Sequence, residues 1–160
     1  MVVDKASQEI ISEKTPKAAQ KDFVFAIGRR KSSTAEVRLY KKDAIVWGGT
    51  PVKRGEFVVN NKSALEYFGK GLDKVYGEPL QITGMGDKLA VSIKVRGGGK
   101  KGQLDAAVLA IARALDKIDK EKFHTALKKK GMLTRDPRVR ERRKVGMGGK
   151  SRRRKQSPKR

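Results

Sequence analysis

Residues 88–118 read KLAVSIKVRGGGKKGQLDAAVLAIARALDKI, and this stretch decides the fold class of the chain. Apolar and polar side chains alternate over 88–96, which predicts a β-strand with one apolar and one strongly basic face. Over 103–118 the apolar side chains recur every three or four residues, which predicts a helix with one apolar stripe facing a sheet. The apolar positions are Leu89, Val91, Ile93 and Val95 in the strand, and Leu104, Val108, Ile111, Leu115 and Ile118 in the helix.

The segments before this stretch add further strands. The glycine-rich residues 48–51 are expected to break the chain, and the apolar run 57–59 leads into a turn at Asn60 and Asn61. Strands are expected at 23–27, 35–40, 44–47 and 79–83.

Three more helical segments are expected. Ser63 and Glu66 form a capping box that opens a short helix ending at Phe68, and a turn or helical piece follows as far as Tyr76. Asp119 can cap a further helix over 120–130, which ends at Gly131. The order β-β-β-α-β-β-α-α predicts an α+β fold: a two-layer sandwich whose mixed sheet of four or five strands carries helices on one face.

The positive charge is concentrated at the carboxyl end. The chain has a net charge of +23, and residues 128–160 contain 16 Lys or Arg against two acids, Asp136 and Glu141. The same segment has only five larger apolar side chains, Met132, Leu133, Val139, Val145 and Met147. Their burial cannot offset the entropy lost when the segment is ordered, and we therefore expect an extended arm that needs a polyanion to order it. We therefore expect a disordered or loosely docked extension over 1–21, a globular RNA-binding domain over 22–130 and an extended basic tail over 131–160.

Several classes of function are disfavoured by composition. The chain has no Cys and one His, His124, which excludes disulfides and thiolate metal sites and leaves the common nucleophile–base pairs nearly unavailable. No apolar run approaches the roughly 20 residues of a membrane span, and the first 20 residues contain acids and no apolar core. We expect a cytoplasmic protein with no catalytic residue, no metal, no cofactor, no small-molecule substrate and no membrane partner.

The segment 97–102, GGGKKG, matches the glycine pattern of dinucleotide-binding loops and lies between the expected strand and helix. A dinucleotide fold requires a second parallel strand after that helix, whereas another helix is expected here. A better interpretation is a phosphate-binding site made by the helix N-terminus with Lys100 and Lys101. Such a site could bind an RNA phosphate as well as the phosphate of a nucleotide.

The basic side chains of the tail suit the phosphates of structured RNA. Arg outnumbers Lys by nine to four over 135–160, and a guanidinium can pair with two phosphate oxygens. The tail has no Phe, Tyr or Trp, so capture of single strands by base stacking is disfavoured.

Four motifs together resemble a known family. They are GRRKSSTAEVRL at 28–39, KVRGGG at 94–99 with Gly102 and Gln103, IARAL at 111–115, and LKKKGMLTRDPRVRERRKVG at 127–146, followed by a terminal Lys159-Arg160. The family they resemble is the bacterial small-subunit ribosomal protein S-nine family, over about residues 23–160.

The resemblance implies a body folded like the second domain of ribosomal protein S-five, placed in the head of the small subunit beside other head proteins. It also implies that the tail threads through rRNA toward the anticodon stem-loop of the peptidyl-site tRNA, which Lys159 and Arg160 would contact. Pro158 departs from the family pattern and stiffens the tip. The basic clusters and the resemblance together predict these rRNA-binding residues: Arg29, Arg30, Lys31, Lys94, Arg96, Lys100, Lys101, Lys128, Lys129, Lys130, Arg135, Arg138, Arg140, Arg142, Arg143, Lys144, Lys150, Arg152, Arg153, Arg154 and Lys155.

Three other functions fit parts of the pattern. The protein subunit of an RNA-processing ribonucleoprotein would share a basic α+β plan, but the long tail without aromatic residues argues against it. A nucleotide-using enzyme could be built around 97–102, and a nucleoid protein could use the same positive charge on duplex DNA.

Overall fold

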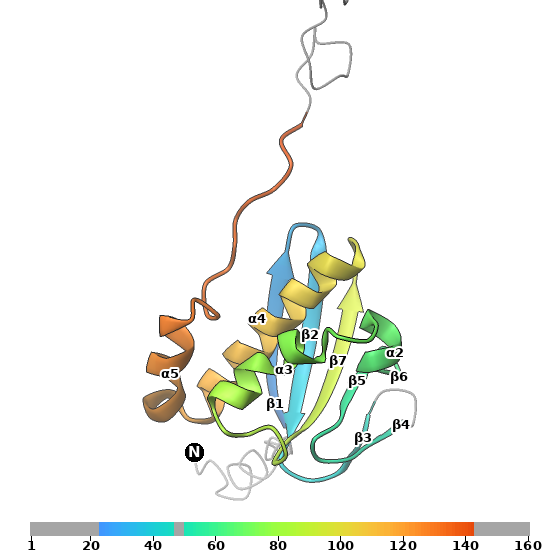
Figure 1. Cartoon of the computed structure of the whole chain (residues 1–160), viewed down its shortest axis with the longest axis vertical. Coiled ribbons are helices and arrows are strands. Elements are labelled where there is room, and N and C mark those ends of the chain that lie inside the picture. The colour runs from blue at the N-terminus through green and yellow to red at the C-terminus, as the bar shows by residue number, and fades with distance from the viewer. Residues whose placement is uncertain (1–22, 47–49, 143–160) are drawn as a thin grey trace, which may run out of the picture.

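The computed structural model describes residues 23–46 and 50–142, and Figure 1 shows a mixed sheet with helices packed on one face. The hydrogen-bonded neighbours β1–β2 and β2–β7 are antiparallel, β7–β5 is parallel, and β5–β6 is antiparallel. In spatial order the five strands are β1 (Phe23–Arg30), β2 (Ser33–Tyr40), β7 (Ala90–Arg96), β5 (Phe57–Val59) and β6 (Lys62–Ser63).

A short ribbon and four helices complete the described part of the chain. β3 (Ala44–Val46) and β4 (Thr50–Val52) pair antiparallel with each other. The helices are α2 (Ala64–Phe68), α3 (Asp73–Ile82), α4 (Lys100–Ile118) and α5 (Lys120–Lys129). The α+β class, the mixed sheet and the helices on one face are confirmed.

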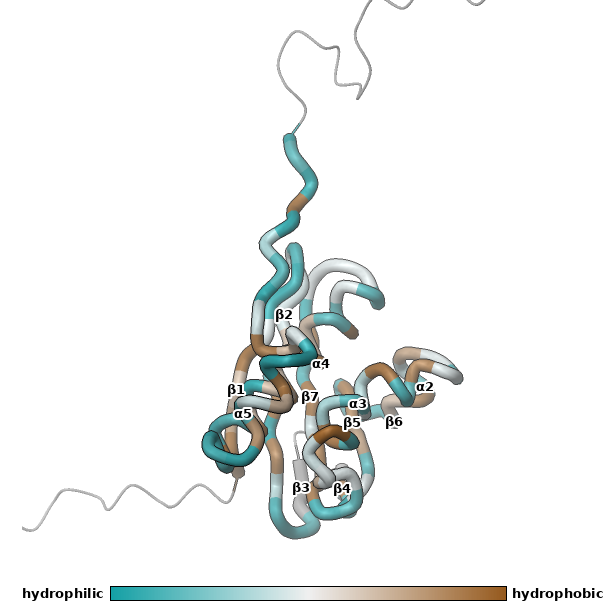
Figure 2. The backbone as a smooth tube through the Cα atoms, turned by 60° about the vertical axis from the view of Figure 1, so that its left-hand side comes forward, coloured by the Kyte–Doolittle hydropathy of each residue, from teal (hydrophilic) through white to brown (hydrophobic). Residues whose placement is uncertain are grey.

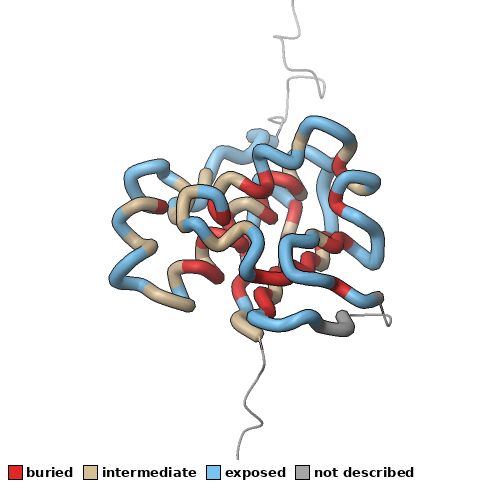
Figure 3. The backbone as a smooth tube through the Cα atoms, turned by 60° about the horizontal axis from the view of Figure 1, so that its bottom comes forward, coloured by how far each residue is buried: buried red, intermediate tan, exposed pale blue. Residues whose placement is uncertain are grey.

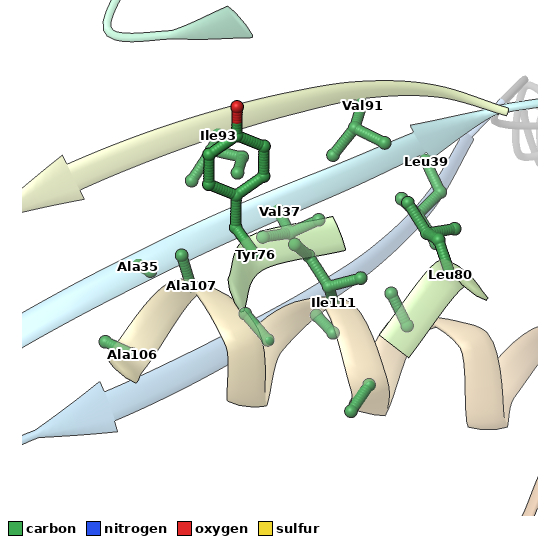
Figure 4. Close-up of a cluster of buried hydrophobic side chains, with 14 of the residues drawn as sticks. Ala35, Val37, Leu39, Tyr76, Leu80, Val91, Ile93, Ala106, Ala107 and Ile111 are labelled. Carbon is green, nitrogen blue, oxygen red and sulfur yellow. The ribbon is translucent and has the colours of Figure 1, made fainter. Parts of the chain in front are cut away.

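The core lies between the sheet and the helices α3 and α4, as the buried segments in Figure 3 and the side chains in Figure 4 show. β2 buries every second residue against α4, as its alternating pattern predicts. α4 presents small side chains to the sheet, so the helix and the strands approach closely. The side chains of this core include Ala35, Val37, Leu39, Tyr76, Leu80, Val91, Ile93, Ala106, Ala107 and Ile111.

The opposite face of the sheet is covered only in part. Val52 of β4 packs there with Tyr40, Val58 and Ala90, and Phe23 packs at the margin. Toward the hairpin end, the pairing places Glu36 opposite Lys94 and Thr34 opposite Arg96 on this same face. The basic face expected for the strand at 88–96 is therefore the face without helices.

The sequence pattern predicted a strand at 79–83. This prediction is wrong, because residues 79–82 belong to α3. Pro79 and the nearby Gly77 weaken the helical signal in the sequence, since both residues disfavour helix interiors. Tyr76 and Leu80 lie one helical turn apart and are both buried, so tertiary packing outweighs the local preference.

The expected break over 48–51 is also wrong in part, because Thr50 and Pro51 lie in β4. A proline is tolerated in such a ribbon because an edge strand need not use every backbone N–H group. Phe57–Val59 is a full strand of the sheet, and Asn60 and Asn61 both have positive φ angles, 47° and 66°, as a two-residue hairpin turn requires.

Two helix starts were predicted from capping residues. Asp119 is confirmed as the N-cap of α5, because its side chain accepts a hydrogen bond from the Lys122 backbone N–H at 3.2 Å. Ser63 does precede α2, but its side chain makes no capping hydrogen bond.

The outer edge of the sheet is occupied by side chains of α4. Lys117 Nζ donates to the Phe25 carbonyl at 2.8 Å, and Arg113 Nη1 donates to the Ile27 carbonyl at 3.1 Å. Both carbonyls belong to β1 and face away from β2. No helix in the described ranges is long and apolar enough to cross a bilayer.

Candidate nucleic-acid interface

Two loops that are far apart in the sequence pack against each other at one end of the sheet. The β1–β2 turn contains Lys31, whose φ is 52°, and Gly97 and Gly98 follow β7 with φ angles of 70° and 63°. A Cβ on Gly98 would collide with Ser33 Oγ, and one on Gly97 would lie 2.6 Å from the Ser32 carbonyl oxygen. The glycines are therefore needed for close packing on the hairpin as well as for the backbone turn.

The glycine loop is fixed by the first turn of α4. Gln103 Nε2 donates to the Gly97 carbonyl at 3.0 Å, and Gln103 Oε1 accepts from the Tyr67 hydroxyl at 2.9 Å. Lys100 and Lys101 lie in this first turn and are exposed. The hairpin cations and the cations at the start of α4 thus lie at the same end of the body, as Figure 1 shows.

The tail begins at a well-formed helix end. Gly131 has a φ of 71°, its N–H donates to the Lys128 carbonyl at 2.9 Å, and the Met132 N–H donates to the Leu127 carbonyl at 3.1 Å. This pair of hydrogen bonds is the Schellman motif. Met132 and Leu133 then pack against the main core, so the root of the tail is anchored to the body.

From this root the chain runs toward the hairpin end. Figures 1 and 2 show the segment after α5 passing the β1–β2 hairpin, and Figure 2 shows that it is mostly hydrophilic. Arg138, Arg140 and Arg142 are exposed along it. It contains neither helix nor strand from residue 135 as far as residue 142, and the extended form expected for the whole of 131–160 stays a prediction.

Arg30 joins the body to the tail. Its guanidinium lies 2.9 Å from Asp136 Oδ2 and 3.6 Å from Asp105 Oδ2, and its Nη1 donates to the Arg138 carbonyl at 2.8 Å. The Arg30 side chain is only 14% exposed, whereas Asp136 is 30% exposed. Arg30 was predicted to contact rRNA. In the folded chain its guanidinium is paired with Asp136 and Asp105, and the rRNA contact stays a prediction.

Asp136 also binds the arginine two residues further on. Its Oδ2 accepts from Arg138 Nη2 at 2.7 Å, and its Oδ1 accepts from the Arg138 backbone N–H at 2.9 Å. These bonds, with the added attraction of the Arg138 and Arg30 charges, hold the pKa of Asp136 well below its ordinary value. The side-chain hydrogen bond to Asp136 and the negative charge of Asp136 raise the pKa of Arg138.

A pocket of about 360 Å³ lies between the edge of the sheet, α4 and the tail, and is lined by Ile27, Arg29, Arg113 and Arg135. Arg29 and Arg135 were predicted to contact RNA, and the structure brings them together although they are far apart in the sequence. Arg113 was missed, because a single arginine inside an apolar helix pattern gives no signal of its own. Its place on α4 beside β1 becomes evident only once the helix is packed.

The remaining predicted residues divide into three groups. Lys94 and Arg96 lie on the face of the sheet without helices, where Arg96 Nη2 lies 3.9 Å from Glu36 Oε1. The exposed lysines at the end of α5 lie at the root of the tail; they are Lys128, Lys129 and Lys130. Outside the described residues lie Arg143, Lys144, Lys150, Arg152, Arg153, Arg154, Lys155, Lys159 and Arg160.

The glycine segment 97–102 and the acidic side chains do not together form a pocket or a metal site among the described residues. The segment 97–102 lines neither the arginine pocket nor the larger pocket of the body, and helix α5 rather than a strand follows α4. The larger pocket, about 970 Å³, lies between β5 and α3, away from the basic clusters. Within residues 23–46 and 50–142 there is no group of three acidic or histidine side chains that could hold a metal ion.

His124 has a structural explanation. Its Nδ1 lies 2.8 Å from Asp116 Oδ1, so the two side chains join α5 to α4. A hydrogen bond between neighbouring helices accounts for the only histidine of the chain.

Comparison with protein families agrees with this arrangement. The family model described as "Ribosomal protein S9/S16" matches residues 28–160, which include the end of β1 with the turn into β2, the glycine loop, α4 and the tail. Proteins of this family are in general not enzymes. The chain therefore belongs to the S9/S16 family of ribosomal proteins, structural RNA-binding components of the small subunit of the cytoplasmic ribosome that serve translation.

Proposed function

We propose that the protein lies in the head of the small subunit, where the hairpin end of its body binds head-domain rRNA and its tail extends toward the peptidyl-site tRNA. The observation that carries this proposal is the convergence of three basic segments at one end of the body. The β1–β2 hairpin is held against the glycine loop before α4, and Arg30 holds residues 136–138 of the tail beside the hairpin.

The charge balance at this end favours an anionic partner. The nearby acids Glu36, Asp105 and Asp136 each face an arginine at 3.9 Å or less. Several cations of the interface form no ion pair with an acid among the described residues; they are Arg29, Lys31, Lys100, Lys101 and Arg135. Each such cation placed on a phosphate releases condensed counterions, which favours binding at moderate salt.

The tail would act in two sections. Arg138, Arg140 and Arg142 continue the positive charge beyond the body, so they can follow the phosphates of closely packed rRNA helices. Lys159 and Arg160 are proposed to contact the anticodon stem-loop of the tRNA, as the family resemblance suggests. Neighbouring head proteins would complete the site.

The test is to measure binding of the full-length protein to a transcript of the head domain of small-subunit rRNA over a range of KCl concentrations. Replacing Arg29 and Lys31 by Ala should weaken binding and reduce the slope of log K against log [KCl] by roughly 0.7–0.9 for each phosphate that is no longer bound. The matched control replaces two exposed lysines that follow β2 at the end opposite the hairpin turn, Lys41 and Lys42, and should change neither quantity. Equal affinity for duplex DNA of the same length, or equal losses in both double variants, would overturn the proposal.

A further inference from the structure

We propose that the ion pair between Arg30 and Asp136 assembles a binding site for one phosphate group of RNA from three arginines, Arg29, Arg113 and Arg135. The site rests on the proposed function, since its phosphate would belong to the head rRNA. It goes beyond that function because Asp136, although it is an acid, would strengthen the binding of an anion.

The first step is the attachment of the tail. Asp136 accepts from Arg30 of β1 and from Arg138, and Arg30 also donates to the Arg138 carbonyl. Arg30 is held in turn by Asp105 of α4 at 3.6 Å. Four groups from β1, α4 and the tail are therefore linked, and the backbone on both sides of Pro137 is tied to the edge of the sheet.

The second step is the position of the neighbouring residue. Arg135 lies between Leu133, which packs against the core, and Asp136, so the contact of Asp136 with Arg30 fixes the chain on its carboxyl side. In this position Arg135 lines the pocket with Arg29 of β1 and Arg113 of α4. Arg113 is itself oriented, because its Nη1 donates to the Ile27 carbonyl at 3.1 Å.

The third step is the chemistry of the pocket. Its four lining residues are three arginines and one isoleucine, and none of them is an acid. Three guanidinium groups facing one space repel each other, and an anion between them removes that repulsion. A phosphate diester fits best, because a guanidinium can donate two hydrogen bonds to two phosphate oxygens.

For the replacement of Asp136, the proposal predicts the opposite change in RNA affinity from the one that net charge alone predicts. Replacing an acid in a polycationic tail raises the net charge by one, so long-range electrostatics predicts tighter binding to RNA. If Asp136 holds Arg135 in the pocket, the same replacement must weaken binding, because Arg135 has to be ordered again when the RNA binds. Glu141 provides the matched control, since it lies five residues further along the tail, is exposed, and takes no part in the ion pairs of Asp136.

The experiment compares full-length wild type with Asp136→Asn and Glu141→Gln in binding to the head-domain rRNA transcript. Asp136→Asn should bind roughly tenfold more weakly, with a salt slope smaller by about one phosphate contact. Glu141→Gln should bind as tightly as wild type or more tightly. An Asp136→Asn protein that binds as well as Glu141→Gln would overturn the proposal.

A second variant tests the pocket without touching the tail. Arg113→Gln removes the guanidinium charge from the pocket while keeping a polar side chain, and it should show the same fall in affinity and in salt slope as Asp136→Asn. Combining the two variants should add little, because both disable one site. Additive losses would show that the two residues act separately, which contradicts the proposal.

The outcomes separate this site from the proposed function. If wild type fails to prefer head rRNA, the proposed function and the site both fail. If wild type and Glu141→Gln bind head rRNA tightly and Asp136→Asn and Arg113→Gln do so equally well, only the phosphate site fails. Unchanged circular dichroism and thermal midpoints in the variants show that a loss of affinity is not a loss of fold.

Discussion

Gly28 of β1 and Ala106 of α4 lie so close together that a Cβ on Gly28 would collide with the Ala106 carbonyl oxygen and lie 2.7 Å from the Ala110 backbone nitrogen. The atoms that a Cβ would meet belong to the backbone, so no side-chain rotation can make room. This contact joins the hairpin strand to the helix that carries Arg113.

Gly28→Ala should therefore destabilise the fold by about 1–3 kcal/mol, the usual cost of overpacking a close contact. Gly77→Ala is the control: Gly77 lies inside α3, and its Cβ would meet only Gln81 Nε2 at 3.9 Å. Gly77→Ala should stabilise the protein by roughly 0.5–1 kcal/mol, because alanine favours helix interiors. Urea unfolding of both variants measures the difference, and equal effects would contradict the close contact.

The turn between β5 and β6 makes a second prediction. Asn60 donates from Nδ2 to the Val95 carbonyl and accepts from the Val95 N–H at Oδ1, at 3.1 and 3.0 Å. Asn60→Gly keeps the positive φ but removes both bonds, and should cost about 1–3 kcal/mol. Asn61→Gly, at the next position of the turn, should change the free energy of unfolding by less than about 0.5 kcal/mol. Equal losses would show that the turn conformation alone matters.

Helix α3 can be tested through two of its apolar residues. Leu80 is 1% exposed and Val75 is 39% exposed, so they lie on opposite sides of the helix. Leu80→Ala should cost about 2–5 kcal/mol because it leaves a cavity in the core. Val75→Ala should remain within about 0.5 kcal/mol of wild type in chemical denaturation. A large loss at Val75 would contradict this packing of α3.

The carboxyl group of Asp136 in the tail should titrate at an unusually low pH. The pKa of Asp136 is lowered, so the stabilisation from its ion pairs is fully present above the ordinary aspartate pKa of about 3.9 and is lost only as the pH falls through the lower folded value. Carboxyl ¹³C shifts followed by NMR should show this, and Arg138→Ala should raise the midpoint more than Arg30→Ala. A midpoint near the ordinary value in wild type would contradict the ion pairs.

Deleting Lys159 and Arg160 should leave incorporation into the small subunit unchanged. It should weaken peptidyl-site tRNA binding by about 1 kcal/mol for each phosphate that the truncated tail can no longer reach. The rate of tRNA dissociation from purified subunits measures this. Unchanged dissociation would count against the proposed tRNA contact. Loss of incorporation would assign these residues to assembly instead.

The sequence predicted those parts of the fold that depend on local periodicity. The strand at 88–96 and the helix at 103–118 carry unmixed apolar patterns, and the structure places β7 and α4 there. Asp119 was found because an N-cap is a short-range contact. α3 was predicted only as a turn or helical piece ending at Tyr76, because Gly77 and Pro79 hide the helical period that continues to Leu80.

The candidate site shows the same limit. The clusters of basic residues were visible in the sequence, since charge needs no geometry to be counted. The contacts of Arg30 with Asp136 and Arg138 span more than a hundred residues, and no local pattern could indicate them. The role of Asp136 was hidden further because a lone acid among arginines looks like an exception to the charge run.

The outer edge of β1 bears on whether copies of the protein can associate with one another through their sheets. An open strand edge is a template on which identical chains can stack into fibrils. Here the carbonyls of Phe25 and Ile27 are already occupied by Lys117 and Arg113, and both side chains carry charge. A second copy that added to this edge would have to displace both hydrogen bonds and approach two positive charges.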